Sequence, residues 1–350
     1  MLRSRLLMSA LLIPLLAAIF FLDMQTGQSA ALFGPLCMAL SALAAGELVQ
    51  IVRNRVPTLT KLDVQLACVT VVLIGWGMHA GPASPRRFIT IGSSQWQSGG
   101  GQLLQNFLTG IVGPRQGQSL ISLVDGGTTT IAAGVAGMFV LLCGLAWFVE
   151  AMIRYERGRL TPGQVVPHMS AKLLIVLYAG GLIAATSQLR WYGINSGAGY
   201  RLLAGVLVAV KAGDIGAYFI GRQFGKEHPL KRLSPGKTGA GFVGAVITGS
   251  VGFTLWMLLT HPQRLNLLPL KEGTLLAVQL LLVGLILAMG GICGDLAESL
   301  MKRECGVKDS SNLLPGFGGV LDVLDSVIFV GSALVIVSTL VAGMGTIAAS

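Results

Sequence analysis

Long apolar stretches constrain the fold of this 350-residue sequence more than any other feature. Nine of them approach the roughly 20 residues that cross a bilayer as a helix; they cover 6–22, 30–52, 64–80, 129–150, 171–187, 202–220, 242–260, 274–293 and 326–347. Only 11% of the residues are charged, compared with about a quarter in a soluble domain. No alternating strand pattern is sustained, and backbone polar groups in lipid must pair within their own segment. The sequence therefore predicts an all-α transmembrane bundle of about nine spans.

The first apolar stretch has two interpretations. Arg3 and Arg5 precede it as in a signal peptide, but no clear small-residue cleavage pattern follows Leu22, so we expect a retained helix. We divide the chain into N-terminal transmembrane helices over 1–200, with a polar loop at 81–128, and a C-terminal transmembrane domain over 201–350.

Lysine and arginine are distributed unevenly between alternate loops. With the N-terminus inside, 17 of the 25 cations fall in inside segments and 7 in outside segments, and Lys211 lies within a span. Cytoplasmic loops carry the excess of positive charge in membrane proteins. The sequence therefore predicts a membrane protein whose N-terminus is cytoplasmic. The polar loops 221–241 and 294–325 then face the cytoplasm.

Six of the 15 acidic residues lie between Asp295 and Asp325. If the preceding span continues as a helix, Asp295, Glu298 and Lys302 share one face, and Asp322 and Asp325 share a face before the last span. Mg²⁺ prefers oxygen ligands of this kind. A solvated loop is the alternative, but an unpaired carboxylate close to the membrane is costly. We expect a divalent-cation site at this surface.

A second polar stripe lies in the span over 202–220 and continues just beyond it. Its residues recur at helical spacing and comprise Lys211, Asp214, Tyr218 and Arg222. Such a stripe indicates a functional cavity, or else an ion pair that only locks helix packing. The loop that follows is basic and contains glycines, which suits phosphate groups. No role is assigned to any of the four histidines, because none pairs with another at ligand spacing.

Several ordered motifs occur within 205–335. The principal ones are Gly294–Arg303, Gly306–Ser311 and Leu314–Ser326, preceded by Asp214–Tyr218 and by Ser234-Pro235-x-Lys237-Thr238. Together they resemble the signature of the phosphatidate cytidylyltransferases. The resemblance implies transfer of CMP from CTP to phosphatidic acid, with release of pyrophosphate, in phospholipid synthesis. It also implies that Asp295 and Asp322 hold Mg²⁺ and a monovalent cation such as K⁺.

These observations together give the predicted site. We predict catalytic roles for Lys237, Lys302, Arg303, Lys308 and Asp309, substrate binding by Asp214, Tyr218, Arg222, Ser234 and Thr238, and metal binding by Asp295, Asp322 and Asp325. The expected partners are CTP, phosphatidic acid and membrane lipid. We expect no nucleic acid among them, and a homodimer remains an open alternative.

The sequence departs from the family pattern close to the expected site. Phe317 stands where the family usually has His, and Val323 where it usually has Arg. Gly239-Ala240-Gly241 replaces the usual Trp-Glu-Gly, and Gly236 replaces a lysine. Two alternatives to the enzyme therefore remain open. One is a divergent or weakly active relative with an altered substrate, and the other is a non-catalytic lipid-binding or transport protein. A transporter more often shows inverted repeats, and we find none.

Overall fold

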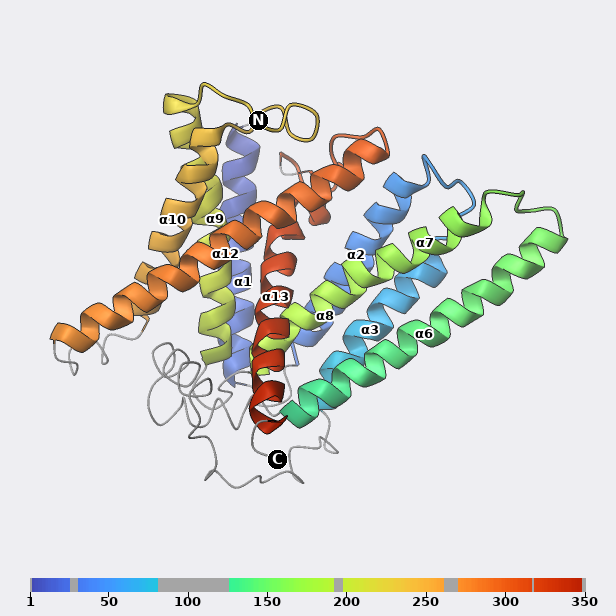
Figure 1. Cartoon of the computed structure of the whole chain (residues 1–350), viewed down its shortest axis with the longest axis horizontal. Helices are drawn as coiled ribbons and strands as arrows, with labels where there is room; N and C mark the ends of the chain where they lie inside the picture. Colours follow the sequence, from blue (N-terminus) through green and yellow to red (C-terminus); the bar gives the residue numbers. More distant parts are fainter. Residues whose placement is uncertain are drawn as a thin grey trace. The chain divides into compact units, whose positions relative to one another are not determined.

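The computed structural model describes residues 2–25, 31–80, 126–191, 198–260, 270–316 and 318–347 (Figure 1). Throughout these ranges the regular structure is helical, apart from one isolated bridge between Leu314 and Gly318. The prediction of an all-α fold is therefore confirmed. Residues 81–125 of the predicted polar loop lie outside the described residues, as does Phe317.

Helices account for most of the described chain. They are α1 (Leu2–Gln25), α2 (Phe33–Val52), α3 (Leu62–Ala80), α6 (Gly126–Glu156), α7 (Val165–Ile175), α8 (Leu182–Ser187), α9 (Ala198–Phe224), α10 (Gly239–Leu259), α12 (Leu270–Glu304) and α13 (Val320–Ile347). A π-helical stretch at Val176–Gly181 joins α7 to α8, and a 3₁₀ turn at Gln188–Trp191 follows.

Seven helical segments in the described ranges are long and apolar enough to cross a membrane. Shorter apolar helices lie at Ala10–Gln25 and Leu62–Gly77. The chain is therefore an integral membrane protein, and these segments agree with the prediction of about nine spans.

Several helices extend beyond the predicted apolar stretches. The span predicted over 274–293 continues as α12 to Glu304, and the one predicted from 326 begins at Val320. α7 begins at Val165, six residues before the predicted stretch, and Lys172, one of the 17 cations counted in inside segments, is fully buried in this helix. Hydropathy marks only the apolar part of a span, whereas polar residues on one face extend the helix without changing its geometry.

The chain forms two compact units. Unit 1 comprises Met1–Pro85, Thr130–Gln188 and Leu300–Leu324; unit 2 comprises Arg86–Thr129, Leu189–Ser299 and Asp325–Ser350. The proposed functional division at residue 200 stays a prediction.

In unit 1, α2, α3 and the α7–α8 segment pack side by side (Figure 1). Gly180 lies against the backbone of Cys68, where an added Cβ would stand 3.0 Å from its Cα. The buried Lys172 ties three helices together, because its Nζ lies 2.5 Å from both Asp63 Oδ2 on α3 and Glu150 Oε2 on α6.

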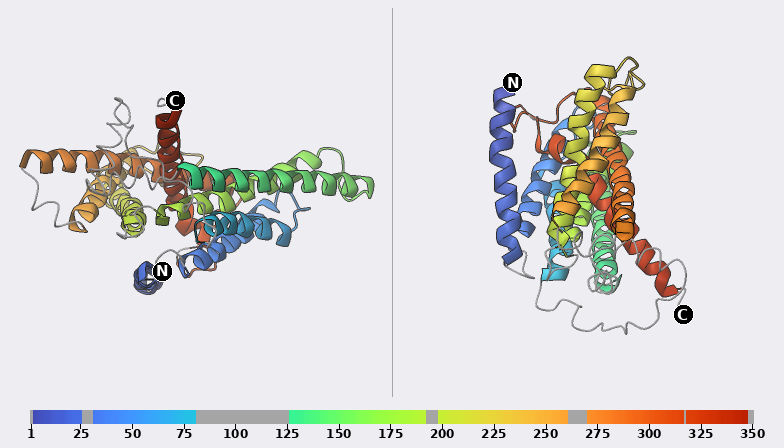
Figure 2. Two further views of the ribbon diagram at one scale, coloured as in Figure 1. Left: turned by 90° about the horizontal axis from the view of Figure 1, so that it is seen from below. Right: turned by 90° about the vertical axis from the view of Figure 1, so that its left-hand side faces the viewer.

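In unit 2, α9 and α10 form an antiparallel pair, and they stay adjacent in the views of Figure 2. Small residues let the two backbones approach closely, as is common between membrane helices. Gly216 faces Thr248, whose Oγ1 donates to the carbonyl of Ala212 at 2.9 Å. Gly284 of α12 packs against Ser250 of α10. This close packing fixes the helices that carry the candidate site.

Candidate active site

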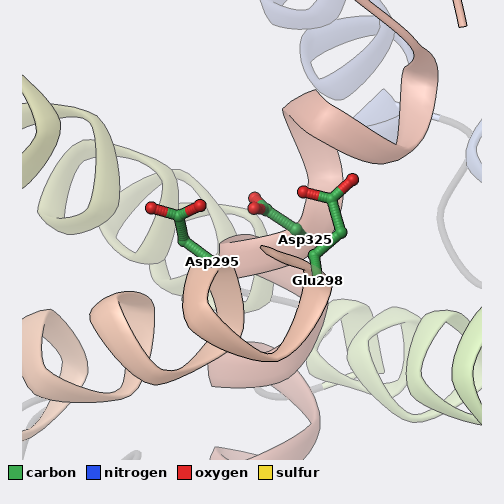
Figure 3. Close-up of side chains that lie close together, drawn as sticks. All are labelled: Asp295, Glu298 and Asp325. Carbon is green, nitrogen blue, oxygen red and sulfur yellow. The ribbon is translucent and has the colours of Figure 1, made fainter. Parts of the chain in front are cut away.

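Three carboxylates converge in unit 2. Asp295 and Glu298 lie one turn apart on α12, and Asp325 comes from α13. One oxygen from each residue can be chosen so that all lie within 4.8 Å of one another, and Figure 3 shows the Asp325 carboxylate between the other two. Glu298 is 1% exposed and Asp325 is 4% exposed. Carboxylate oxygens gathered in a buried position are the donor set of a hard divalent cation, so these residues fit Mg²⁺.

A glycine allows this convergence. A Cβ at Gly294 would stand 2.8 Å from Ser326 Cα and 2.9 Å from the carbonyl oxygen of Asp325. No larger residue fits there, so α12 and α13 touch at the turn that carries the carboxylates. Asp295 and Asp325 were predicted metal ligands. Glu298 was placed on the same helix face but was not predicted to be a ligand.

A cavity of about 440 Å³ lies beside Asp295 in unit 2. Its polar lining includes five of the predicted site residues in addition to Asp295, and these are Asp214, Tyr218, Arg222, Lys237 and Thr238. Lys237 forms an ion pair with Asp295. His228, which was assigned no role, also lines the cavity. The cavity therefore joins basic side chains to one member of the carboxylate cluster.

The polar stripe on α9 is internally paired. Lys211 Nζ lies 3.2 Å from Asp214 Oδ2, and the Arg222 guanidinium donates to the Tyr218 hydroxyl at 3.2 Å. The ion pair that was one interpretation of this stripe is present. Both of its side chains are about half exposed, at 45% and 56%, and Asp214 also lines the cavity. The pairing thus coexists with a position at the candidate site.

The loop between α9 and α10 is fixed at its end by Thr238. This residue caps α10, since its Oγ1 accepts from the backbone N–H of Gly241 at 3.1 Å. The backbone N–H of Gly239 donates to the Glu227 carbonyl at 3.0 Å. Ser234 lies in this loop, and its backbone carbonyl accepts from the N–H of Lys237 at 3.1 Å. It is not among the residues that line the cavity.

The remaining predicted residues belong to unit 1. Asp322 Oδ1 lies 2.6 Å from Lys302 Nζ, and its Oδ2 accepts from Ser310 Oγ at 2.7 Å and from the backbone N–H of Gly319 at 2.7 Å. Asp322 is thus held in one orientation by the Lys302 ammonium group and by two neutral hydrogen-bond donors.

The turn that precedes this network contains three further predicted residues. The Arg303 guanidinium donates to the Val307 carbonyl at 3.2 Å, and Lys308 and Asp309 are exposed.

Sequence reasoning missed one residue of this network. Glu47 on α2 accepts hydrogen bonds from Ser311 and from the backbone at the start of α13, and Ser310 Oγ lies 3.2 Å from its Oε2. The available signal was a carboxylate inside an apolar stretch, which usually marks a functional position.

The fold and this geometry define a polytopic α-helical membrane protein with a charged cavity beside a carboxylate cluster. The family model described as "Cytidylyltransferase family" matches residues 3–341, and the chain therefore belongs to the cytidylyltransferase family.

Curated bacterial proteins are similar to parts of the chain. It is 41% identical over 123 residues to a phosphatidate cytidylyltransferase of Bacillus subtilis, covering 35% of this chain and 42% of the relative. It is 39% identical over 135 residues to the uncharacterized protein YnbB of Escherichia coli, covering 39% and 41%. A phosphatidate cytidylyltransferase of Pseudomonas aeruginosa is 38% identical over 190 residues, covering 53% and 64%. The matches thus span less than two thirds of each of these relatives.

Proposed function

We propose that this protein transfers CMP from CTP to phosphatidic acid, giving CDP-diacylglycerol and pyrophosphate. The observation that carries the proposal is the cavity in unit 2, where Lys237 pairs with Asp295 at the edge of the carboxylate cluster. Membership of the cytidylyltransferase family and the names of two relatives support the same reaction.

The chemistry explains why both signs of charge are needed. A phosphate oxygen of phosphatidic acid attacks the α-phosphorus of CTP, the bond to the β-phosphate breaks, and pyrophosphate leaves. Both reactants are anions, so catalysis depends on positioning and on charge neutralisation. Lys237 and Arg222 line the cavity and would bind phosphate oxygens. Asp214, Tyr218, Ser234 and Thr238 keep their proposed roles in substrate binding.

We assign the divalent cation to Asp295, Glu298 and Asp325, because their oxygens already converge. Bound there, Mg²⁺ would neutralise phosphate charge and stabilise the leaving group. Asp322 keeps its proposed role as a ligand of a cation such as K⁺. Lys302, Arg303, Lys308 and Asp309 keep their proposed catalytic roles.

We further propose that the protein lies in the bacterial cytoplasmic membrane with the cavity open to the cytoplasm. Without the buried Lys172, 16 of the 25 cations lie in segments on the side of the N-terminus. This orientation would let CTP enter from the cytosol while phosphatidic acid arrives in the membrane.

The test is a direct assay. The purified full chain in detergent is given labelled CTP, phosphatidic acid and Mg²⁺, and lipid-soluble label is measured. We expect labelled CDP-diacylglycerol and an equal amount of pyrophosphate, and none with D295N. Absence of product, under conditions in which the Bacillus subtilis relative is active, contradicts the proposal.

An altered substrate is the second candidate, favoured by Val323 and Phe317 at positions where the family usually has polar residues. The same assay with the four nucleoside triphosphates, and with other phospholipid and alcohol acceptors, distinguishes the two. Faster transfer from another nucleotide, or to another acceptor, supports the second candidate. Lipid binding without any nucleotide turnover supports a non-catalytic protein.

A further inference from the structure

A buried glutamate on α2 accepts hydrogen bonds from the far end of the sequence. The Glu47 carboxylate is 6% exposed and lies within the apolar α2. It accepts from Ser311 Oγ at 2.7 Å and from the backbone N–H groups of Val320 and Leu321 at 2.9 and 2.8 Å. Ser310 Oγ lies 3.2 Å from Glu47 Oε2. All of these residues belong to unit 1.

The donors around Glu47 require a carboxylate. Oε1 accepts from Ser311 and from the Val320 N–H, whereas Oε2 faces Ser310 and accepts from the Leu321 N–H. A backbone N–H can only donate. A glutamine amide group would therefore point its NH₂ at one of the two N–H groups, whichever way it turned. The N–H groups also belong to the first turn of α13, where the helix dipole favours negative charge.

The Glu47 network is continuous with that of Asp322. Ser310 Oγ stands between the two carboxylates, 2.7 Å from Asp322 Oδ2 and 3.2 Å from Glu47 Oε2. The backbone N–H groups of Ser310 and Gly319 also donate to Asp322 Oδ2, at 3.1 and 2.7 Å. A Cβ at Gly319 would collide with Ser310 Oγ and with the Glu47 carboxylate. The loop ending at Gly319 is thus held between Glu47 and Asp322.

We propose that Glu47 is a positioning residue for Asp322: it fixes the Ser310–Ser311 loop and the start of α13, and so holds the Asp322 carboxylate ready for a cation. This inference rests on the proposed function, in which Asp322 is a cation ligand, and adds a residue that positions it. Glu47 acts through Ser310 and through the backbone.

The test compares E47Q with S41A. Gln has nearly the same size as Glu but cannot accept from both N–H groups. Ser41 lies on the same helix and is also buried, and its Oγ donates to the Ala179 carbonyl at 2.8 Å, away from the loop. S41A removes this hydrogen bond, so its effects show what a general disturbance of α2 does when Glu47 is intact.

The first readout is amide hydrogen exchange of the cation-free full chain in detergent, resolved to single residues. In E47Q we expect loss of protection at Val320 and Leu321, and also at Ser310 and Gly319, which bond to Asp322. S41A keeps protection at all four. Unchanged exchange at Ser310 and Gly319 in E47Q overturns the proposal, even if Val320 and Leu321 exchange faster.

The second readout is the dependence of CDP-diacylglycerol synthesis on Mg²⁺ and on K⁺. In E47Q we expect the half-activating concentration of one of these cations to rise about 10-fold or more, the usual effect of losing a partner behind a metal ligand. The KM for CTP at saturating cation stays at the wild-type value. Wild-type cation dependence in E47Q overturns the proposal.

A milder variant keeps the proposal testable if E47Q fails to fold. S311A removes one donor of Glu47 and leaves Asp322 and its partners intact. We expect both readouts to shift in the same direction by a smaller amount, and no shift in either contradicts the proposal. If the wild-type chain makes no CDP-diacylglycerol, the proposed function fails, while the exchange experiment still decides whether Glu47 orders the groups that hold Asp322.

Discussion

Lys302 Nζ lies 2.6 Å from Asp322 Oδ1, and the two side chains are only 11% and 12% exposed. An ammonium group therefore occupies one oxygen of a carboxylate that we propose as a cation ligand. In K302Q we expect the maximal rate of CMP transfer to fall about 100-fold, because a charge that stabilises the reacting phosphates is lost. The half-activating concentration of K⁺ or Mg²⁺ should fall as well, since the competing charge has gone.

Cation titrations of the transfer reaction measure both effects. R159Q is the matched control, since Arg159 is an exposed cation in the turn between α6 and α7. A K302Q protein that needs more cation than the wild type would show that Lys302 assists cation binding instead of competing with it.

Removal of one carboxylate from the cluster should abolish most of the activity. We expect D295N, E298Q and D325N each to lower the rate about 100-fold or more, because a bound cation contributes several kcal/mol to the transition state. Expression and thermal stability should remain close to wild type. E298Q is the most informative variant, because the sequence did not predict Glu298 as a metal ligand and the structure places it in the cluster. Wild-type turnover in E298Q would remove Glu298 from the metal site.

How far the sequence could predict this protein depends on the range of each interaction. The spans were predictable, because hydrophobic length alone determines them. Likewise, helical spacing places Asp295 and Glu298 on the same face of one helix. The proximity of Asp325 depends on α12 touching α13 at Gly294, and sequence spacing cannot show such a contact.

Glu47 illustrates the limit more sharply. A lone acid in an apolar helix indicates a special position, but the sequence does not identify its donors. These are the Ser311 hydroxyl and two backbone N–H groups, more than 250 residues away, with the Ser310 hydroxyl beside them. Only tertiary packing brings them to one carboxylate, so the residue could be noticed from the sequence but not interpreted.

The buried ion cluster of unit 1 should stabilise the fold. Lys172 is fully buried between Asp63 and Glu150, and K172M would remove the cation that these two carboxylates share, while Glu150 keeps its ion pair with Arg154 at 2.7 Å. Because the carboxylates are 34% and 29% exposed, the loss of this charged partner should lower the free energy of unfolding by about 1.5–3 kcal/mol. Thermal unfolding in detergent measures the change. R157M is the control, because Arg157 is exposed in the turn after α6 and an exposed surface charge is worth about 1 kcal/mol or less. Equal losses in the two variants would contradict this assignment.

Close packing of α9 on α10 should not tolerate a side chain at Gly216. A Cβ there would collide with Thr248 Oγ1. We expect G216A to lower the free energy of unfolding by about 1–3 kcal/mol, as in other overpacked cores. G137A on α6 is the control, because an added Cβ there has open space. If G216A unfolds at the same temperature as G137A, the two helices are not in close contact at this position.

The proposed orientation can be tested in intact cells. We place single cysteines at Lys231, in the loop expected inside, and at Gln263, in the loop expected outside, in a chain without its five native cysteines. Because cations are concentrated on one side, a membrane-impermeant maleimide should label Q263C and should not reach K231C until the cells are lysed. Labelling is read by the mass shift of the purified chain. The reverse pattern would place the charged cavity on the outer face, where CTP is not supplied, and would contradict both the orientation and the proposed reaction.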